Sequence, residues 1–193
     1  MATAVNTYPV RFDVQYPARL SRGLIFVKWL LAAPHYLLLR YALGPLQLAC
    51  SAIAFFWILV TERYPRGLFD LWVNAGRWGV QVGAYTGLMR DEYPPFSWDP
   101  GAYPITFEVD YPAQLSRWLI FVKWLLLVPH YIVLIFLSCA ALVVSIVAWF
   151  AILFTEQFPR GMFDFLVGVD RWAFRVFAYF SLLRDEYPPF SLS

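Results

Sequence analysis

The chain has 193 residues, of which 61% are hydrophobic and 15% charged, and its mean hydropathy is +0.57. These values exclude an intrinsically disordered chain and are typical of an integral membrane protein. The formal net charge of +2 is too small to indicate a nucleic-acid-binding protein, and no basic block stands apart from the apolar segments.

The sequence contains two copies of one unit. Residues 8–98 align with residues 103–192, and the stretches LIFVKWLL, PHY, PRG and LRDEYPPFS are identical in both. A repeat that covers nearly the whole chain indicates duplication of one structural unit. We therefore expect a first membrane repeat at residues 1–98 and a second at residues 99–193.

Each repeat opens with a short segment in which apolar and polar side chains alternate, YPVRFDVQYP in the first and YPITFEVDYP in the second. In the first copy Val10, Phe12 and Val14 would face one side of a strand. The prolines at both ends confine such a segment to a short edge strand. Two interpretations stay open: the segments pair with each other as a ribbon, or each is an extended arm on a membrane surface.

One long apolar run follows in each repeat, at residues 21–62 and 116–156. About 20 apolar residues cross a bilayer, so each run is long enough for two short crossings or one long tilted helix. Gly44–Pro45 predicts a turn in the first run. Ser138–Cys139 predicts a softer turn at the corresponding place in the second run, so both runs are candidates for helical hairpins.

The arginines favour the hairpins. If each run is a transmembrane helical hairpin, twelve of the thirteen arginines lie on one side of the membrane, and only Arg40 lies near a far tip. Single crossings would place the arginines of the central segment on the opposite side and remove this bias. The positive-inside rule therefore predicts a multi-pass protein with both termini in the cytoplasm.

A second helix is predicted after each run, at residues 68–89 and 162–183. It carries a narrow polar stripe on an otherwise apolar and aromatic surface, which favours an amphipathic helix lying in the headgroup layer. A third crossing with the stripe turned into a bundle is the alternative. The stripe contains a repeated acid–base pair that we expect to orient this helix, namely Asp70 with Arg77 and Asp164 with Arg171.

Four ionisable residues inside the apolar runs are candidate functional residues, because intramembrane charge is costly. Lys28 and Lys123 are expected to extend their ammonium groups to the headgroups, with Glu62 or Glu156 as ion-pair partners. His35 and His130 follow seven residues later, each directly after a proline. A histidine at that place is expected to bond a carbonyl freed by the proline, and ligation of a tetrapyrrole metal is the less favoured alternative.

The sequence DEYPPFS closes both repeats. Acidic residues and prolines end a helix, and the aromatic side chains are suited to the membrane interface. The stiff Pro–Pro step also makes the segment a candidate docking motif for a partner protein. The candidate docking residues are Asp91, Tyr93 and Pro94 in the first copy and Asp185, Tyr187 and Pro188 in the second.

Signatures of common active sites do not occur in the chain. The sequence contains no phosphate-binding loop, nucleophile elbow, zinc-ligand spacing or dinucleotide fingerprint. We therefore predict that the protein is not an enzyme and carries no cofactor.

The paired motifs YPxxFxxxYP, LSRxLIFVKWLLxxPHY, PRGxFD, RW and LRDEYPPFS resemble those of the bacterial membrane family catalogued as domain of unknown function 4389. The resemblance covers almost all of both repeats. It implies a small bacterial protein of the inner membrane and supplies no catalytic residues.

The expected fold class is an all-α integral membrane protein. It has two tandem repeats, each a transmembrane hairpin plus an interfacial amphipathic helix, preceded by a short extended segment. The expected function is that of a non-catalytic accessory or scaffold subunit of a larger membrane complex in the lipid bilayer. A membrane-shaping hairpin protein and a small transporter with a path between the repeats are the alternatives.

Overall fold

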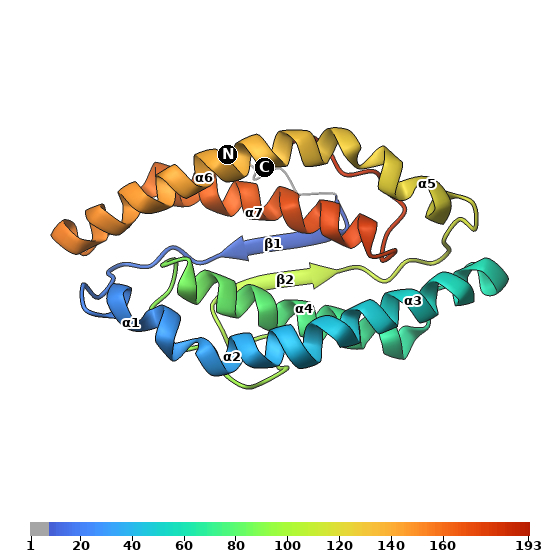
Figure 1. Cartoon of the computed structure of the whole chain (residues 1–193), viewed down its shortest axis with the longest axis horizontal. Coiled ribbons are helices and arrows are strands. Elements are labelled where there is room, and N and C mark those ends of the chain that lie inside the picture. Colours follow the sequence, from blue (N-terminus) through green and yellow to red (C-terminus); the bar gives the residue numbers. More distant parts are fainter. Residues whose placement is uncertain (1–7) are drawn as a thin grey trace.

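The computed structural model describes residues 8–193, and these residues form two similar helical halves around a central two-stranded ribbon (Figure 1). The first half contains β1 (Val10–Val14), α1 (Leu24–Leu31), α2 (Ala33–Leu38), the π-helical turn η1 (Leu39–Leu43), α3 (Gly44–Thr61) and α4 (Arg66–Thr86). The second half contains β2 (Ile105–Val109), α5 (Leu119–Leu126), α6 (Val128–Thr155) and α7 (Arg160–Phe180).

The ribbon confirms one of the two interpretations of the alternating segments. β1 and β2 pair antiparallel, with Phe12 opposite Phe107, and every second side chain of both strands is buried. A two-stranded ribbon is marginally stable by itself in water. Its stability must therefore come from the helices that its buried face contacts.

Each strand packs against a helix of the other repeat. β1 lies beside α7 and β2 lies beside α4, as the central part of Figure 1 shows. The rings of Phe12 and Phe107 both make edge-to-face contacts with Phe174 of α7, at centroid distances of 4.9 and 5.6 Å. The two repeats consequently share one hydrophobic core.

The hairpins expected in the apolar runs are wrong for the second repeat, because α6 continues without interruption from Val128 to Thr155. Ser138 and Cys139 lie inside this helix, since neither residue breaks the backbone hydrogen bonds as glycine or proline would. In the first repeat Pro45 lies in the first turn of α3, where its missing N–H is not needed.

The π-helical turn η1 explains a difference in length between the repeats. The first apolar run is one residue longer than the second. A π-helical turn accommodates one extra residue in a helix without ending it. The run from Leu24 to Thr61 is therefore one kinked helix, corresponding to the run from Leu119 to Thr155, which has a single break at Leu127.

Helices α4 and α7 differ from the expected interfacial helices, because about half of their residues are buried inside the protein. Trp72 of α4 and Phe163 of α7, for example, are almost inaccessible to solvent. Through the middle of Figure 1 the order from top to bottom is α6, α7, β1, β2, α4 and α3, and the helices of each outer pair cross towards the sides. Helices α4 and α7 thus each lie between a long apolar helix and the ribbon, and these neighbours cover two of their sides.

The two long helical runs are long and apolar enough to cross a membrane, with 38 and 37 residues. In the most apolar window of the second run, only 6% of the window is buried within the protein. The core helix of a soluble protein would be largely covered. This surface is the strongest structural indication that the chain associates with a membrane.

A candidate functional site repeated in both halves

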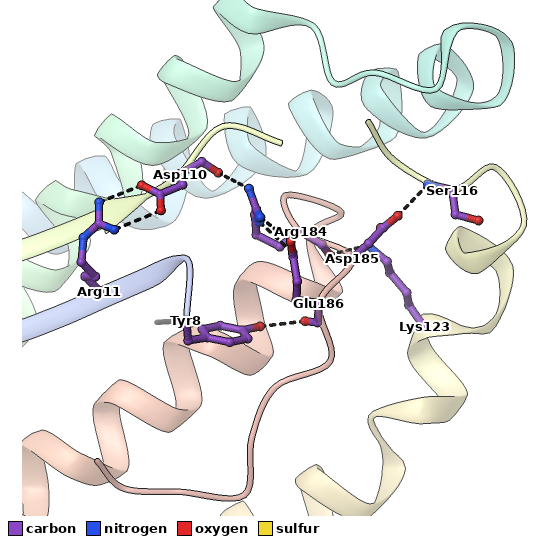
Figure 2. Close-up of polar contacts among 8 residues, drawn as sticks. All are labelled: Tyr8, Arg11, Asp110, Ser116, Lys123, Arg184, Asp185 and Glu186. Carbon is purple, nitrogen blue, oxygen red and sulfur yellow. Dashed lines mark hydrogen bonds and ion pairs between the residues drawn. The ribbon is translucent and has the colours of Figure 1, made fainter. Parts of the chain in front are cut away.

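A buried lysine lies at the centre of the candidate site in the second half. Lys123 on α5 is 1% exposed, and its Nζ lies 2.7 Å from Asp185 Oδ1 (Figure 2). The same ammonium donates to the carbonyl oxygen of Arg184 at 2.6 Å and lies over the ring of Tyr179. The three contacts replace the water that a buried ammonium loses.

A tight turn after α7 brings Asp185 to this lysine. Leu182 adopts a left-handed backbone conformation with φ of 65°, and the N–H of Leu183 bonds back to the carbonyl oxygen of Ala178. The second carboxylate oxygen of Asp185 accepts a hydrogen bond from the N–H of Ser116 at 2.6 Å. Asp185 therefore fixes both the start of the α5 segment and its lysine.

The first half repeats this geometry closely. Lys28 Nζ lies 2.8 Å from Asp91 Oδ1 and 2.6 Å from the carbonyl oxygen of Arg90, and Asp91 accepts from the N–H of Ser21. The expected extension of both lysines towards the headgroups is therefore wrong. Glu62 and Glu156, the expected partners, instead pair with arginines of the opposite repeat.

A second layer of polar contacts ties the turn after α7 to the ends of the ribbon (Figure 2). Arg184 pairs with Glu186 and donates to the carbonyl oxygen of Asp110 at 2.8 Å. Tyr8 donates its hydroxyl proton to the carbonyl oxygen of Glu186 at 2.8 Å. Hydrogen bonds from the Arg11 guanidinium hold the pKa of Asp110 below its usual range.

The two histidines occupy matching aromatic cages. Trp78 Nε1 donates to His35 Nδ1 at 3.0 Å, and Trp172 Nε1 makes the same bond to His130. Because an indole nitrogen only donates, Nδ1 must be unprotonated and Nε2 must carry the proton. In each half a phenylalanine of the DEYPPFS segment stacks on the imidazole, with Phe190 at 3.9 Å in the second.

The carbonyls at the helix breaks are bonded by tyrosines, which corrects the expected role of the histidines. Tyr93 donates its hydroxyl proton to the carbonyl oxygen of Leu31 at 3.2 Å, and Tyr187 donates to that of Leu126 at 2.9 Å. His35 and His130 are fully buried, and among the described residues nothing bonds their Nε2 atoms. A tetrapyrrole has no access to either nitrogen in this arrangement.

The candidate docking residues of the DEYPPFS segments are bound within their own repeats. Asp91 and Asp185 contact the lysines, Tyr93 and Tyr187 contact the helix breaks, and Pro94 and Pro188 are buried. The residues considered for docking a partner are thus the ones that close each repeat on itself. The prediction that these segments bind a partner protein stays untested.

The acid–base pairs of the polar stripe do not form. Asp70 pairs with Arg66 and Asp164 with Arg160, both one helical turn away. Arg171 instead donates to the carbonyl oxygen of Phe12 in β1 at 2.9 Å. Its counterpart Arg77 donates to the carbonyl oxygen of Phe107 in β2 at 3.3 Å. The arginines hold the ribbon, and the aspartates remain at the surface.

The chemistry of the site is that of a closed structural pair. The lysine and the carboxylate are both engaged, and the part of the chain that the structure describes contains no cluster of three or more metal-ligating side chains. Sequence reasoning missed the Trp and Phe residues of the histidine cages. The signal was available, because Trp78, Phe96 and their counterparts are identical in both repeats.

Fold and site together define a duplicated helical protein in which each half is closed by a Lys–Asp pair and a His–Trp–Phe cage. The family model described as "Domain of unknown function (DUF4389)" matches residues 22–97 and 117–191. The chain belongs to this family, in two tandem copies. No curated protein and no solved structure matches the chain. Both strands of the ribbon lie outside the matched ranges.

Proposed function

We propose that this is a non-catalytic membrane protein whose two long helices lie within one leaflet and expand it. The observation that carries the proposal is the set of large apolar side chains exposed along both helices. The most exposed of them include Trp29, Tyr41, Leu48, Phe56, Trp118, Phe136 and Phe154. An apolar surface of this extent is costly in water and is covered by lipid in a bilayer.

Helix length argues against an upright orientation. A run of 37 residues is about 55 Å long, whereas the hydrocarbon core of a bilayer is about 30 Å thick. Fitting one into the other requires a tilt beyond the usual range of roughly 0–40°. The length therefore favours helices that lie close to the membrane plane.

The ribbon gives a second argument for the same orientation. The strands run roughly parallel to the long helices in Figure 1. Arg11 and Glu108 point outward from the ribbon and their side chains are 41% and 50% exposed. An upright molecule would place this charged pair inside the hydrocarbon, which is costly. In the flat orientation it faces the cytoplasm.

The ends of the long helices fit this orientation as well. Arg22 reaches from the start of the first run to Glu156 at the end of the second, and Arg117 makes the reciprocal contact with Glu62. Both ends of the molecule therefore carry arginines that reach the same layer of headgroups. This arrangement retains the arginine asymmetry of the sequence without requiring hairpins.

Insertion into one leaflet bends a membrane because it increases the area of that leaflet alone. We therefore infer a membrane-shaping role. The purified protein, reconstituted at high density, is expected to convert spherical liposomes into tubules. Vesicles that keep their shape at the same protein density would remove this role.

An accessory role in a larger membrane complex is a second proposal. It is supported by the exposed tryptophans Trp29 and Trp124, because aromatic side chains are enriched in the cores of protein interfaces. Purification in mild detergent at native expression is then expected to recover membrane partners in fixed ratio. Recovery of the protein alone, together with tubulation, would favour the membrane-shaping role.

The orientation itself is tested by measuring depth along α6. In a background where Cys50 and Cys139 are alanine, single spin-labelled cysteines are placed at Ile132, Val143 or Phe154, all exposed. The flat orientation predicts three similar depths in the bilayer. An upright helix predicts a deep label at one position and labels near the headgroups at the others, and that result would overturn the proposal. Asp164→Cys serves as a water-exposed control.

A further inference from the structure

A cavity of about 410 Å³ lies between α4, α6 and α7, outside the Lys–Asp sites. Its walls are formed by small and apolar residues, among them Gly79, Gly83, Ala141, Leu142 and Leu166. Among the described residues that line it, Asp170 of α7 is the only one with an ionisable side chain. Two serine hydroxyls from α6, Ser138 and Ser145, are the other polar side chains of the lining.

Asp170 has no partner among the described residues, since it takes part in none of their ion pairs or side-chain hydrogen bonds. The neighbouring arginines of α7 lie elsewhere: Arg171 bonds the ribbon, and Arg175 lies over the ring of Tyr8, where two of its guanidinium nitrogens have no hydrogen-bond partner among the described residues. Burial raises the pKa of Asp170 to about 6. The carboxylate is therefore largely ionised at neutral pH and lacks a counter-charge, which is unfavourable for a partly buried group.

The corresponding place on the other side of the molecule, between α3, α4 and α7, is filled. Gly76 occupies the position equivalent to Asp170. Trp72 is equivalent to Leu166 of the cavity, and Gln47 is equivalent to Ala141. Phe177 is equivalent to Gly83. The rings of Trp72 and Phe177 are in contact, with centroids 5.2 Å apart. Gln47 donates to the carbonyl oxygen of Trp72 at 3.2 Å, so its amide nitrogen is satisfied.

Two equivalent places of the same fold thus differ: the one at Trp72 and Phe177 is filled by side chains, and the one at Asp170 is a cavity. Four substitutions between the halves account for the difference: three make a side chain smaller, and the fourth adds an acid. The cavity is consequently not imposed by the backbone. Its volume is in the range of small-molecule sites, which are mostly apolar with a few polar groups that fix the ligand.

We propose that this cavity binds a lipophilic amine, with the ammonium group at Asp170 and the apolar body between α4 and α6. An ammonium supplies the charge that Asp170 lacks, and an ionic hydrogen bond in an apolar surrounding is strong. The hydroxyl oxygens of Ser138 and Ser145 can accept further hydrogen bonds from the ammonium group. The amine comes either from an aminophospholipid of the bilayer or from a free amphiphile, because both present the same chemistry.

Calorimetric titration of the full chain in phosphatidylcholine nanodiscs tests this proposal. Phenylbutylamine is the probe, and phenylbutanol is the neutral molecule of the same shape. We expect saturable binding of the amine to the wild type and at least tenfold weaker binding of the alcohol. Asp170→Asn is expected to weaken amine binding by at least tenfold, whereas Asp164→Asn, on the exposed side of the same helix, leaves it unchanged.

Two further variants keep the test decisive if Asp170→Asn does not fold. Gly83→Phe adds the ring that Phe177 of α7 contributes to the packed counterpart of the cavity, and a Cβ at Gly83 meets no atom within 4 Å. Ala141→Gln adds the amide of Gln47 beside the carboxylate. Both are expected to abolish amine binding in a folded protein. Undiminished binding in either variant, or equal binding of alcohol and amine, would overturn the proposal.

The source of the amine is distinguished by the lipid composition. If the aminophospholipid is the ligand, replacing part of the phosphatidylcholine with phosphatidylethanolamine competes with phenylbutylamine and lowers its apparent affinity. If the ligand is a free amphiphile, the affinity stays the same in both lipids. Competition and its absence both require that the wild-type protein binds phenylbutylamine. Either result therefore supports an ammonium site, and the two differ only in the source of the amine.

Discussion

The duplication produced two pairs of equivalent places in the molecule. The two Lys–Asp sites have the same structure, whereas the Asp170 cavity and its counterpart at Trp72 and Phe177 differ. At the Lys–Asp sites the halves agree, with Nζ–Oδ1 distances of 2.8 and 2.7 Å and identical tryptophan–histidine bonds of 3.0 Å. At one of the two places where α4 and α7 meet a long helix there is the packed Trp72–Phe177 contact, and at the other there is the Asp170 cavity. The agreement indicates that both repeats require the Lys–Asp site. The difference indicates that the cavity has a role that its packed counterpart does not share.

The largest expected effect concerns the Lys–Asp pairs. Lys28→Met removes the buried ammonium and leaves the partly exposed Asp91 without its ion-pair partner, and we expect a loss of about 3 kcal/mol in the free energy of unfolding. Lys123→Met is expected to cost the same amount, because the two sites match. Denaturant titration in detergent measures both. Adding Asp91→Asn to Lys28→Met should recover part of the loss, and a single variant as stable as the wild type would contradict the structural role.

The arginines that hold the ribbon should give the next largest effect. Arg171→Ala removes a hydrogen bond of 2.9 Å to the carbonyl oxygen of Phe12 and the ion pair with Asp13. We expect a loss of about 2–3 kcal/mol, since bonds to charged groups are the stronger ones. Arg77→Ala should cost less, because its bond to Phe107 is longer, at 3.3 Å. Hydrogen exchange of the strand amides would show whether the loss lies in the ribbon.

Asp170 provides a prediction of opposite sign. Its pKa is raised from 3.8 to about 6 in the folded protein, so folding disfavours the charged form. The wild type, without amine, should therefore lose stability as the pH rises through about 6 and regain it on acidification towards about 4. Asp170→Asn removes this penalty and should stabilise the protein at neutral pH by on the order of 2 kcal/mol.

The sign of this effect separates Asp170 from the exposed carboxylates. The difference between Asp170→Asn and wild type should vanish near pH 4, where Asp170 is largely protonated in the folded state. Thermal unfolding over a range of pH values measures it, with Asp164→Asn as the control. A variant that is less stable than the wild type at neutral pH would mean that Asp170 has a partner within the chain.

The smallest expected effect concerns the tyrosines at the helix breaks. Tyr187→Phe removes a hydrogen bond of 2.9 Å to the carbonyl oxygen of Leu126 and should cost about 1 kcal/mol. Tyr93→Phe removes a longer bond, of 3.2 Å, and should cost somewhat less. Thermal unfolding of the two variants, side by side, tests this ranking. Equal stability of both variants and the wild type would show that water replaces the tyrosines at these carbonyls.

Local patterns in the sequence predicted those parts of the structure that are determined by residues close together along the chain. Alternation between Val10 and Val14 indicated a strand with one buried face, and the duplication indicated two halves of similar structure. The apolar runs indicated long helices. Whether such a run turns back is decided by weak local signals, and Ser138–Cys139 is compatible with an uninterrupted helix. The arginine distribution, which favoured hairpins, is equally satisfied by a flat orientation.

The partners of the buried charges could not be predicted from local patterns. Lys28 meets Asp91 only because a left-handed residue, Leu88, turns the chain back after α4. A leucine in that conformation carries no sequence signature, since glycine is the residue usually found there. The cavity was likewise missed, because it arises from four positions that are distant in sequence. A position-by-position comparison of the halves would have identified Gly76 and Asp170 as one of their polar differences.

The exchange of strands between the repeats has a consequence for biogenesis. Val10 pairs with Val109, so the first strand emerges from the ribosome about a hundred residues before its partner. During that interval α4 lacks the strand that covers it, whereas the strand that covers α7 is made before α7 itself. Neither repeat can complete its core alone. A chain with a single copy would have to exchange strands with a second molecule, so a fused dimer is the simplest origin of this protein.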